Sequence, residues 1–177
     1  MHMDDIRLVQ PDERMLEEIA AYRSAMLAAG SSMDGTSALN KYDDPAQWLA
    51  HVRRLERPET CPTHLVTATL YVAVRVGDGR IVGMIDLRHR LNDYLAICGG
   101  HIGYSVRPDE RRKGYAARML SLVLDKARER GLERVLVTCD EENEASRRTI
   151  LRSGGVFESN IRLEDEKQTV SRYWITL

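Results

Sequence analysis

The residues best suited to chemistry lie between positions 102 and 116, where a strand-forming segment leads into a basic turn and then into a helix. The turn and the first helical residues are Arg111, Arg112, Lys113, Gly114, Tyr115 and Ala116. A helix start offers about four unpartnered N–H groups and a partial positive charge, which suit a phosphate group. Because Gly114 and Ala116 are small, a phosphate could approach the backbone amides closely. The sequence therefore predicts a pyrophosphate site here.

The distribution of charge favours a local anion site over a charged surface. The 26 basic and 27 acidic residues give a formal net charge of -1, which argues against binding to nucleic acid or to an anionic membrane. Between Arg107 and Arg118, however, five basic residues face only Asp109 and Glu110. A solvated helix start whose arginines pair with nearby carboxylates is the alternative. Neither a Walker-type Gly-x-x-x-x-Gly-Lys-Ser/Thr loop nor a dinucleotide Gly-x-Gly-x-x-Gly motif occurs.

The pattern of apolar residues predicts the elements that must position this turn. Strands are expected over residues 6–9, 65–76, 81–87, 101–106, 134–139, 156–163 and 169–176. Helices are expected over residues 15–27, from Pro45 to about 55, over 116–127, and between an N-cap at Asn143 and Gly154. The polar segment 31–44 is predicted to be a mobile loop. We predict one α/β (mixed α+β) domain over residues 1–177, with a central mixed, mostly antiparallel sheet of six to seven strands and about four flanking helices.

Two motifs in this framework resemble those of the GNAT N-acyltransferase superfamily. The motif Arg111-x-x-Gly114-x-Ala116, after a strand that ends in Val106-x-Pro108, looks like its acyl-CoA signature. The motif Asn143-x-x-Ser146 is similar to the start of its second cofactor-side helix. The resemblance covers roughly residues 83–157. The segments 101–108 and 172–175 also resemble a subgroup of predicted acetyltransferases, which implies a chemistry but no particular substrate.

The resemblance implies an acetyl-CoA-dependent N-acetyltransferase with a GNAT-like fold and no metal, in which a neutral primary amine attacks the thioester directly. The pantetheine arm would lie like an extra strand beside the signature strand, and the Val106 N–H would donate to the oxyanion. The cofactor-binding residues that it implies are Tyr104, Ser105, Val106, Arg111, Arg112, Lys113, Gly114, Tyr115, Ala116, Ala117, Asn143 and Ser146. Asn143 could instead only cap its helix.

The amine must lose a proton, which calls for a base with a pKa near neutrality. The candidates are His101 at the start of the signature strand, His89 at the end of the preceding hairpin, and Asp86. Strand alternation places His89 on the face opposite Asp86, and His101 on one face with Ser105, so the three candidates cannot all line one cleft. For each histidine, the alternative is a ring that is satisfied by backbone or solvent.

The departing thiolate also needs a proton donor. Many relatives carry a tyrosine seven residues after the asparagine that matches Asn143, but this chain has Ile150 there. Tyr104 is a candidate replacement, while Tyr115 and Tyr173 are better read as packed aromatics. A thiolate with a pKa of about 8.5 could also leave with help from water. The missing tyrosine motivates the alternative function, a non-catalytic acyl-CoA-binding sensor or regulatory protein.

The remaining features bear on location and partners. With no apolar run of about 20 residues and no signal-like start, the chain is expected to be cytoplasmic. Cys61, Cys98 and Cys139 are far apart and lack C-x-x-C spacing, which predicts reduced thiols without zinc. The expected partner is a small-molecule or peptide amine beside the loop 31–44, where Asp34, Asp43 and Asp44 could attract a cation. Ordinary solvation of the loop is the alternative explanation of these three carboxylates. A homodimer is also possible, and neither nucleic acid nor a membrane is expected.

Overall fold

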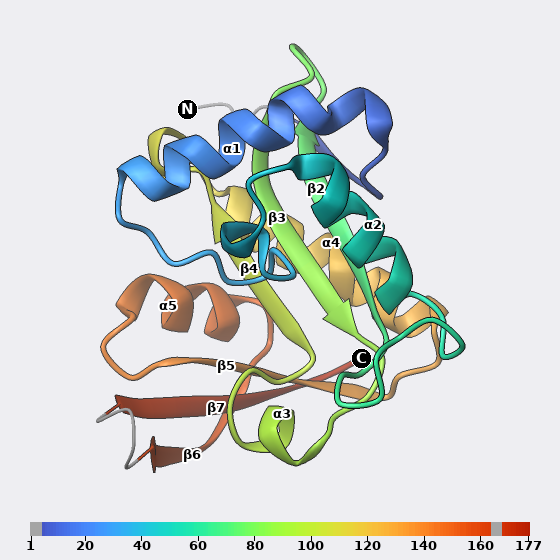
Figure 1. Cartoon of the computed structure of the whole chain (residues 1–177). Coiled ribbons are helices and arrows are strands. Elements are labelled where there is room, and N and C mark those ends of the chain that lie inside the picture. The colour runs from blue at the N-terminus through green and yellow to red at the C-terminus, as the bar shows by residue number, and fades with distance from the viewer. Residues whose placement is uncertain (1–4, 164–167) are drawn as a thin grey trace.

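The computed structural model describes residues 5–163 and 168–177. Within these residues, seven strands form one twisted sheet with helices on both faces (Figure 1). The strands are β1 (Ile6–Val9), β2 (Ala68–Arg75), β3 (Ile81–Arg88), β4 (Ile102–Val106), β5 (Arg134–Asp140), β6 (Val156–Leu163) and β7 (Gln168–Thr176). Their order is β1-β2-β3-β4-β5-β7-β6. The β4–β5 pair is parallel, while the other five pairs are antiparallel. The predicted fold class is therefore confirmed.

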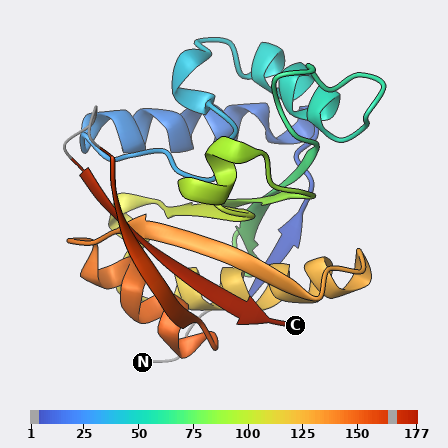
Figure 2. The same cartoon turned by 90° about the horizontal axis from the view of Figure 1, so that it is seen from below.

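The helices divide between the two faces of the sheet. They are α1 (Leu16–Ala28), α2 (Pro45–Leu55), α3 (Asp93–Ile97), α4 (Tyr115–Glu129) and α5 (Glu144–Arg152). Figure 2 shows α1 and α2 above the sheet and α4 and α5 below it. Of these helices, only α3 was not predicted, because five residues are too few to show a helical period.

Two apolar clusters fix these layers. On one face Met119, Leu120 and other residues of α4 pack against the sheet, and on the other face α1 and α2 contribute Tyr22, Trp48 and their neighbours. Val72 and Ala73 are adjacent in β2 but belong to opposite clusters, as the two-residue period of a strand requires. The sheet is thus buried on both sides at its centre, which holds β3 and β4 in place.

Strands β4 and β5 separate in the middle of the sheet. β3 pairs with β4 at five positions, from Gly83↔Val106 to Leu87↔Ile102. In contrast, β4 pairs with β5 at one position in the described chain, Ile102↔Val137. Beyond that pair the two strands diverge (Figure 1), so that residues 103–106 of β4 have no partner strand on the β5 side. The divergence leaves an open wedge in the sheet.

The loop between α1 and α2 is anchored, although the sequence predicts a mobile loop. It contains a 3₁₀ turn (Leu39–Lys41), and the Trp48 indole N–H donates to the Thr36 carbonyl oxygen at 2.8 Å. Gly35 lies directly on β4, because a Cβ at this position would be 2.2 Å from the Gly103 carbonyl oxygen. The buried indole and this backbone contact hold the loop beside the wedge.

Candidate active site

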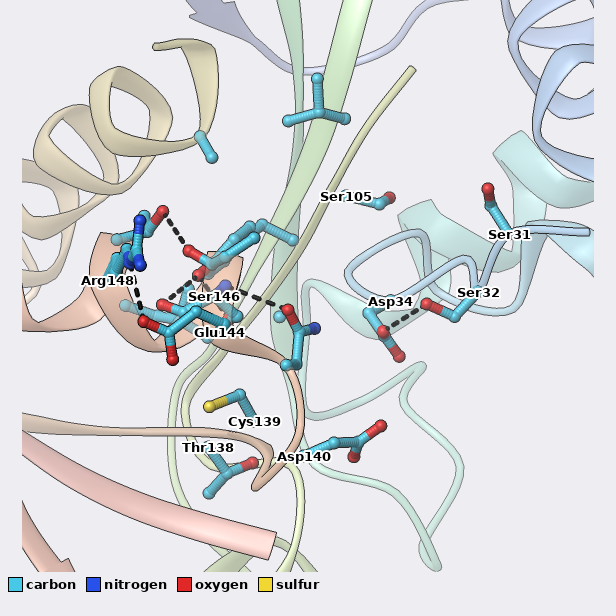
Figure 3. Close-up of a pocket in the computed structure, with 18 of the residues that line it drawn as sticks. Ser31, Ser32, Asp34, Ser105, Thr138, Cys139, Asp140, Glu144, Ser146 and Arg148 are labelled. Carbon is cyan, nitrogen blue, oxygen red and sulfur yellow. Dashed lines mark hydrogen bonds and ion pairs between the residues drawn. The ribbon is translucent and has the colours of Figure 1, made fainter. Parts of the chain in front are cut away.

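A cavity of about 1490 Å³ occupies the wedge between β4 and β5. It is bounded by the loop after α1, the starts of α4 and α5, and the ends of β4 and β5 (Figure 3). Pockets for one small ligand typically measure about 300–1,000 Å³. The cavity is therefore large enough for a large ligand and a second, smaller one.

The start of α4 forms the anion-binding end of the cavity. Gly114 is the N-cap with φ +88°, and no side chain caps the helix there. Tyr115, Ala116 and Ala117 in the first helical turn line the cavity. Since the first N–H groups of a helix lack intrahelical partners, these amides are available to a phosphate. The anion site at this turn stays a prediction.

The basic side chains of the turn, residues 111–114, have different surroundings. Arg111 donates from Nε to the Val106 carbonyl oxygen at 3.1 Å and from Nη2 to Ser31 Oγ at 2.9 Å. Lys113 Nζ lies 2.7 Å from Glu110 Oε2, and Lys113 is not among the residues that line the cavity. Arg112 is exposed and lines the cavity. Direct contact between Lys113 and a cofactor is therefore not supported by this geometry.

Two cations of α5 that the sequence analysis did not single out also line the cavity. They are Arg148 and Arg152, which are four residues apart and so lie on one face of the helix. That spacing is the signal that could have found them. Asn143 accepts a hydrogen bond from the Ser146 N–H at 3.0 Å, which makes it the N-cap of this helix. The capping role of Asn143 is thus present, while a role towards a cofactor stays a prediction.

Tyr104 extends from β4 to α5 and meets Ser146. Its Oη lies 2.7 Å from Ser146 Oγ, and either hydroxyl can donate. Burial raises the pKa of Tyr104 to about 12, although the hydrogen bond to Ser146 lowers it. Burial likewise raises the pKa of the neighbouring Cys139 thiol to about 11. These groups therefore hold their protons at neutral pH and form a short chain of donors inside the wedge.

Ser105 faces the other side of the sheet from Tyr104. Its Oγ lies 3.0 Å from the buried Tyr22 Oη on α1. Burial raises the pKa of this Tyr22 hydroxyl to about 12. The Ser105 side chain therefore already has a partner within the fold, on the face of the sheet opposite Tyr104.

The histidine candidates lie away from the cavity lining. His101 Nδ1 accepts from the Leu136 N–H at 2.9 Å, and the side chain is buried. His89 Nε2 lies 2.9 Å from Thr69 Oγ1. Burial lowers the pKa of each histidine to about 4, helped by Arg88 at His101 and by Arg130 at His89. The structure does not bring either ring to Tyr104 and Ser146, so the geometry does not support a catalytic role for them.

Asp86 is also buried, in the sheet below the wedge. Its Oδ1 accepts from the Gly103 N–H at 2.9 Å, and its Oδ2 lies 3.3 Å from Arg88 Nη2. Burial raises the pKa of Asp86 despite the nearby Arg88 guanidinium. Asp86 is not among the lining residues, whereas Arg88 is. Both of its oxygens are already occupied by partners within the fold.

The opposite wall of the cavity comes from the loop after α1. Figure 3 shows Ser31, Ser32 and Asp34 on one side and Ser146 with its helix on the other. Ser32 Oγ donates to Asp34 Oδ2 at 2.8 Å, and Asp34 is exposed. Residues of α3, including Leu95, line the same end. This part of the cavity lining is separate from the edge of β4, so it offers a place for a second molecule.

Comparison with known proteins agrees with this geometry. Residues 6–156 match the family model described as an acetyltransferase (GNAT) domain, and the chain therefore belongs to the GNAT acetyltransferase family. No curated protein matches the sequence.

Solved structures with the same fold share little sequence with this chain. A ribosomal L7/L12 α-N-protein acetyltransferase in complex with coenzyme A has a TM-score of 0.71 and 15% identity, over 97% of this chain and 94% of that one. A microcin C7 self-immunity acetyltransferase in complex with acetyl-CoA and AMP has a TM-score of 0.69 and 16% identity, over 98% and 93%. A spermidine N-acetyltransferase chimera that includes Vibrio cholerae sequence has a TM-score of 0.67 and 16% identity, over 97% and 95%. At these identities the likeness concerns the fold.

The position where many relatives carry a tyrosine is Ile150, on the core side of α5. Its side chain is fully buried in the apolar cluster and has no group that could donate a proton. Across the described ranges, none of the helices has the length and apolar character required to cross a bilayer.

Proposed function

We propose that this protein transfers the acetyl group of acetyl-CoA to a primary amine. The observation that carries the proposal is that one cavity is lined by the uncapped start of α4, the unpaired edge of β4 and the Tyr104–Ser146 pair. Acetyl-CoA needs partners for a pyrophosphate, for an extended pantetheine arm and for a departing thiolate. The three features supply one partner for each part.

In this proposal the pyrophosphate binds the amides of the basic turn and of the first turn of α4. Arg112, Arg148 and Arg152 line that end and offset the negative charge of the phosphates. The pantetheine arm pairs with the unpaired edge of β4 between residues 103 and 106, because an extended chain can add to a free strand edge. Coenzyme A and acetyl-CoA in two of the related structures support this choice of ligand.

The reaction that we propose is a direct transfer. The neutral amine nitrogen attacks the thioester carbonyl carbon, a C–N bond forms, and the C–S bond breaks. The Val106 N–H donates to the developing oxyanion, and a single such donor contributes about 3 kcal/mol. Tyr104, hydrogen-bonded to Ser146, gives a proton to the departing thiolate and then regains one from solvent, so that no net proton is lost from the enzyme. The amine releases its proton to solvent on the open side of the cavity, since neither histidine lines the site.

The acceptor in this proposal is a small-molecule or peptide amine that enters between the loop after α1 and α3. Asp34 lines that entrance and can attract a protonated amine. The related structures include enzymes named for spermidine and for a protein α-amine, so both kinds of amine belong in a first screen. The three cysteines of the sequence lack C-x-x-C spacing, which suits the cytoplasmic location that we propose.

A non-catalytic acyl-CoA-binding protein is the second candidate. The observation in its favour is the buried Ile150 at the position where many relatives carry their acid. Tyr104 and Ser146 favour the enzyme, because they place a proton donor in the wedge by another route. The two functions differ in whether bound acetyl-CoA is consumed.

Amine-dependent release of CoA thiol tests the proposal. The wild type is incubated with acetyl-CoA and with spermidine, a peptide with a free N-terminus, an aminoglycoside and single amino acids. We expect thiol release above the hydrolysis rate with at least one amine, and an equal amount of acetylated amine by mass spectrometry. Binding of acetyl-CoA without turnover on any of these amines would favour the sensor.

A further inference from the structure

Glu110 is a buried carboxylate at the entrance of the basic turn. It is 2% exposed and accepts from Arg75 Nη1, with both oxygens at 3.0 Å, from Arg80 Nη1 at 3.0 Å and from Lys113 Nζ at 2.7 Å. Burial by itself would raise the pKa of Glu110, but Lys113 and Arg75 outweigh it and the net pKa is lowered. The carboxylate is therefore charged and fully used inside the fold, away from the catalytic groups.

Arg75 holds Glu110 from the β2–β3 hairpin. Besides Glu110, this guanidinium donates from Nε and Nη2 to Asp78 at 2.9 and 2.6 Å. Arg75 ends β2 and is only 13% exposed. The hairpin thus holds Glu110, directly before the basic turn, and Glu110 in turn holds Lys113 inside the turn.

The turn between these two attachment points has an unusual backbone. Arg112 has φ +62° and Gly114 has φ +88°, so two of its four residues occupy the left-handed region. A non-glycine residue persists in that region only when the surrounding structure fixes it. Yet the turn itself is solvent-facing at Arg112 and has no side-chain cap at the start of α4. The contacts of Glu110 with Arg75 and Lys113 are what can hold it.

We propose that Arg75 and Glu110 are positioning residues that hold the basic turn in the shape that binds the cofactor pyrophosphate. They act through Lys113 and the backbone of the turn, although Glu110 also lines the cavity, and the inference rests on the proposed binding of acetyl-CoA at this turn. Affinity for acetyl-CoA then depends on Arg75, a residue of the β2–β3 hairpin that is not among those lining the cavity.

For replacement of Glu110, a purely electrostatic effect and a positioning role predict changes of opposite sign in the affinity for acetyl-CoA. Replacement of Glu110 by glutamine removes a negative charge near the phosphates and frees Lys113 and Arg80 from it. By Coulomb's law this change should strengthen the binding of an anion. If the carboxylate positions the turn, the same replacement should weaken the binding, so that the sign of the change decides.

The experiment is a calorimetric titration of acetyl-CoA into wild type, Glu110→Gln and the control Glu129→Gln. Glu129 lies at the far end of α4, where it pairs on the surface with Lys126. The same proteins are titrated by NMR with acetyl-pantetheine, which has the thioester arm but lacks the pyrophosphate. We expect Glu110→Gln to bind acetyl-CoA about tenfold more weakly with unchanged affinity for acetyl-pantetheine, and we expect wild-type values for Glu129→Gln.

Asp78→Asn covers the case in which Glu110→Gln fails to fold. Asp78 is 50% exposed and holds the Arg75 guanidinium. Its replacement also removes a negative charge, so charge alone again predicts tighter binding, whereas positioning predicts a smaller loss of acetyl-CoA affinity than in Glu110→Gln. Unchanged or tighter binding of acetyl-CoA by a folded Glu110→Gln would overturn the proposal, as would equal losses for both ligands, which indicate general damage. A wild type that does not bind acetyl-CoA would instead overturn the proposed function.

Discussion

Replacement of Gly35 by alanine tests whether the loop after α1 is held against the catalytic strand. Gly35 has φ +69°, and its added Cβ would lie 2.2 Å from the Gly103 carbonyl oxygen and 2.5 Å from the Tyr104 nitrogen. β4 is held to β3 by five residue pairs, so the loop must move by about 1 Å or more. That movement would also displace Asp34 from the acceptor side of the cavity.

Two separate effects should lower the free energy of unfolding of Gly35→Ala. A left-handed backbone costs an alanine about 1–2 kcal/mol, and overpacking typically costs about 1–3 kcal/mol more. Gly131→Ala is the matched control, because Gly131 has φ +83° and nothing within 4 Å of the added Cβ. The control therefore includes the backbone term and the effect of alanine on the unfolded chain, but not the clash.

Urea unfolding of both variants gives the comparison. We expect Gly35→Ala to lower the free energy of unfolding by about 1–3 kcal/mol more than Gly131→Ala does. We also expect Gly35→Ala to raise KM for the amine more than KM for acetyl-CoA. Equal losses of stability in the two variants would show that the loop is not pressed against β4, and the argument for an anchored acceptor wall would be refuted.

Three further predictions concern proton transfer, pH and the acceptor. Tyr104→Phe should lower kcat about 100-fold with unchanged acetyl-CoA affinity in a titration, because it removes the proposed acid; an unchanged kcat would exclude that role. Burial lowers the pKa of His101 to about 4 in the folded chain, whereas a histidine in the unfolded chain has a pKa of about 6.5. Below pH 6.5 the unfolded chain therefore binds a proton that the folded chain does not, and the free energy of unfolding falls as the pH drops towards 4. Wild type should therefore lose about 2 kcal/mol between pH 7.5 and pH 5 that His101→Gln does not lose, as measured by urea unfolding, and equal pH dependence in the two proteins would contradict the shift. Asp34→Asn should raise KM for a cationic amine about fivefold, which is equivalent to roughly 1 kcal/mol for an exposed ion pair. The control is Asp43→Asn in the same loop, which should leave KM unchanged because Asp43 is paired with Arg23. Similar effects of both replacements would indicate that the overall charge of the loop, and not Asp34, attracts the amine.

The fold could be predicted from the sequence because its signals are local. The strand predicted over residues 156–163 and the helix predicted to open at Pro45 have those same bounds in the structure. Asn143 was recognised as an N-cap from its residue type and the helical pattern after it, and its side chain does accept from the Ser146 N–H. Such elements are set by neighbours in the chain, which the sequence shows directly.

Much of the site depends on contacts between distant parts of the chain. Tyr104 and Ser146 are 42 residues apart, and the sequence gives no sign that their hydroxyl groups meet. His101 was one of three candidate bases, and the sequence does not show that its ring accepts from the Leu136 N–H on another strand. Likewise, Lys113 lies within the signature motif, but its partner is the buried Glu110 and not an open site.

The central claim, that the turn before α4 binds acetyl-CoA, is tested most directly by calorimetric titration of acetyl-CoA into wild type and Gly114→Glu. The control is Gly131→Glu, which adds the same carboxylate at a second left-handed glycine, just beyond the other end of α4. We expect micromolar binding by wild type and by the control, and no binding by a folded Gly114→Glu, whose side chain blocks and repels the pyrophosphate. Equal binding by all three proteins, or no binding by folded wild type, would contradict the account.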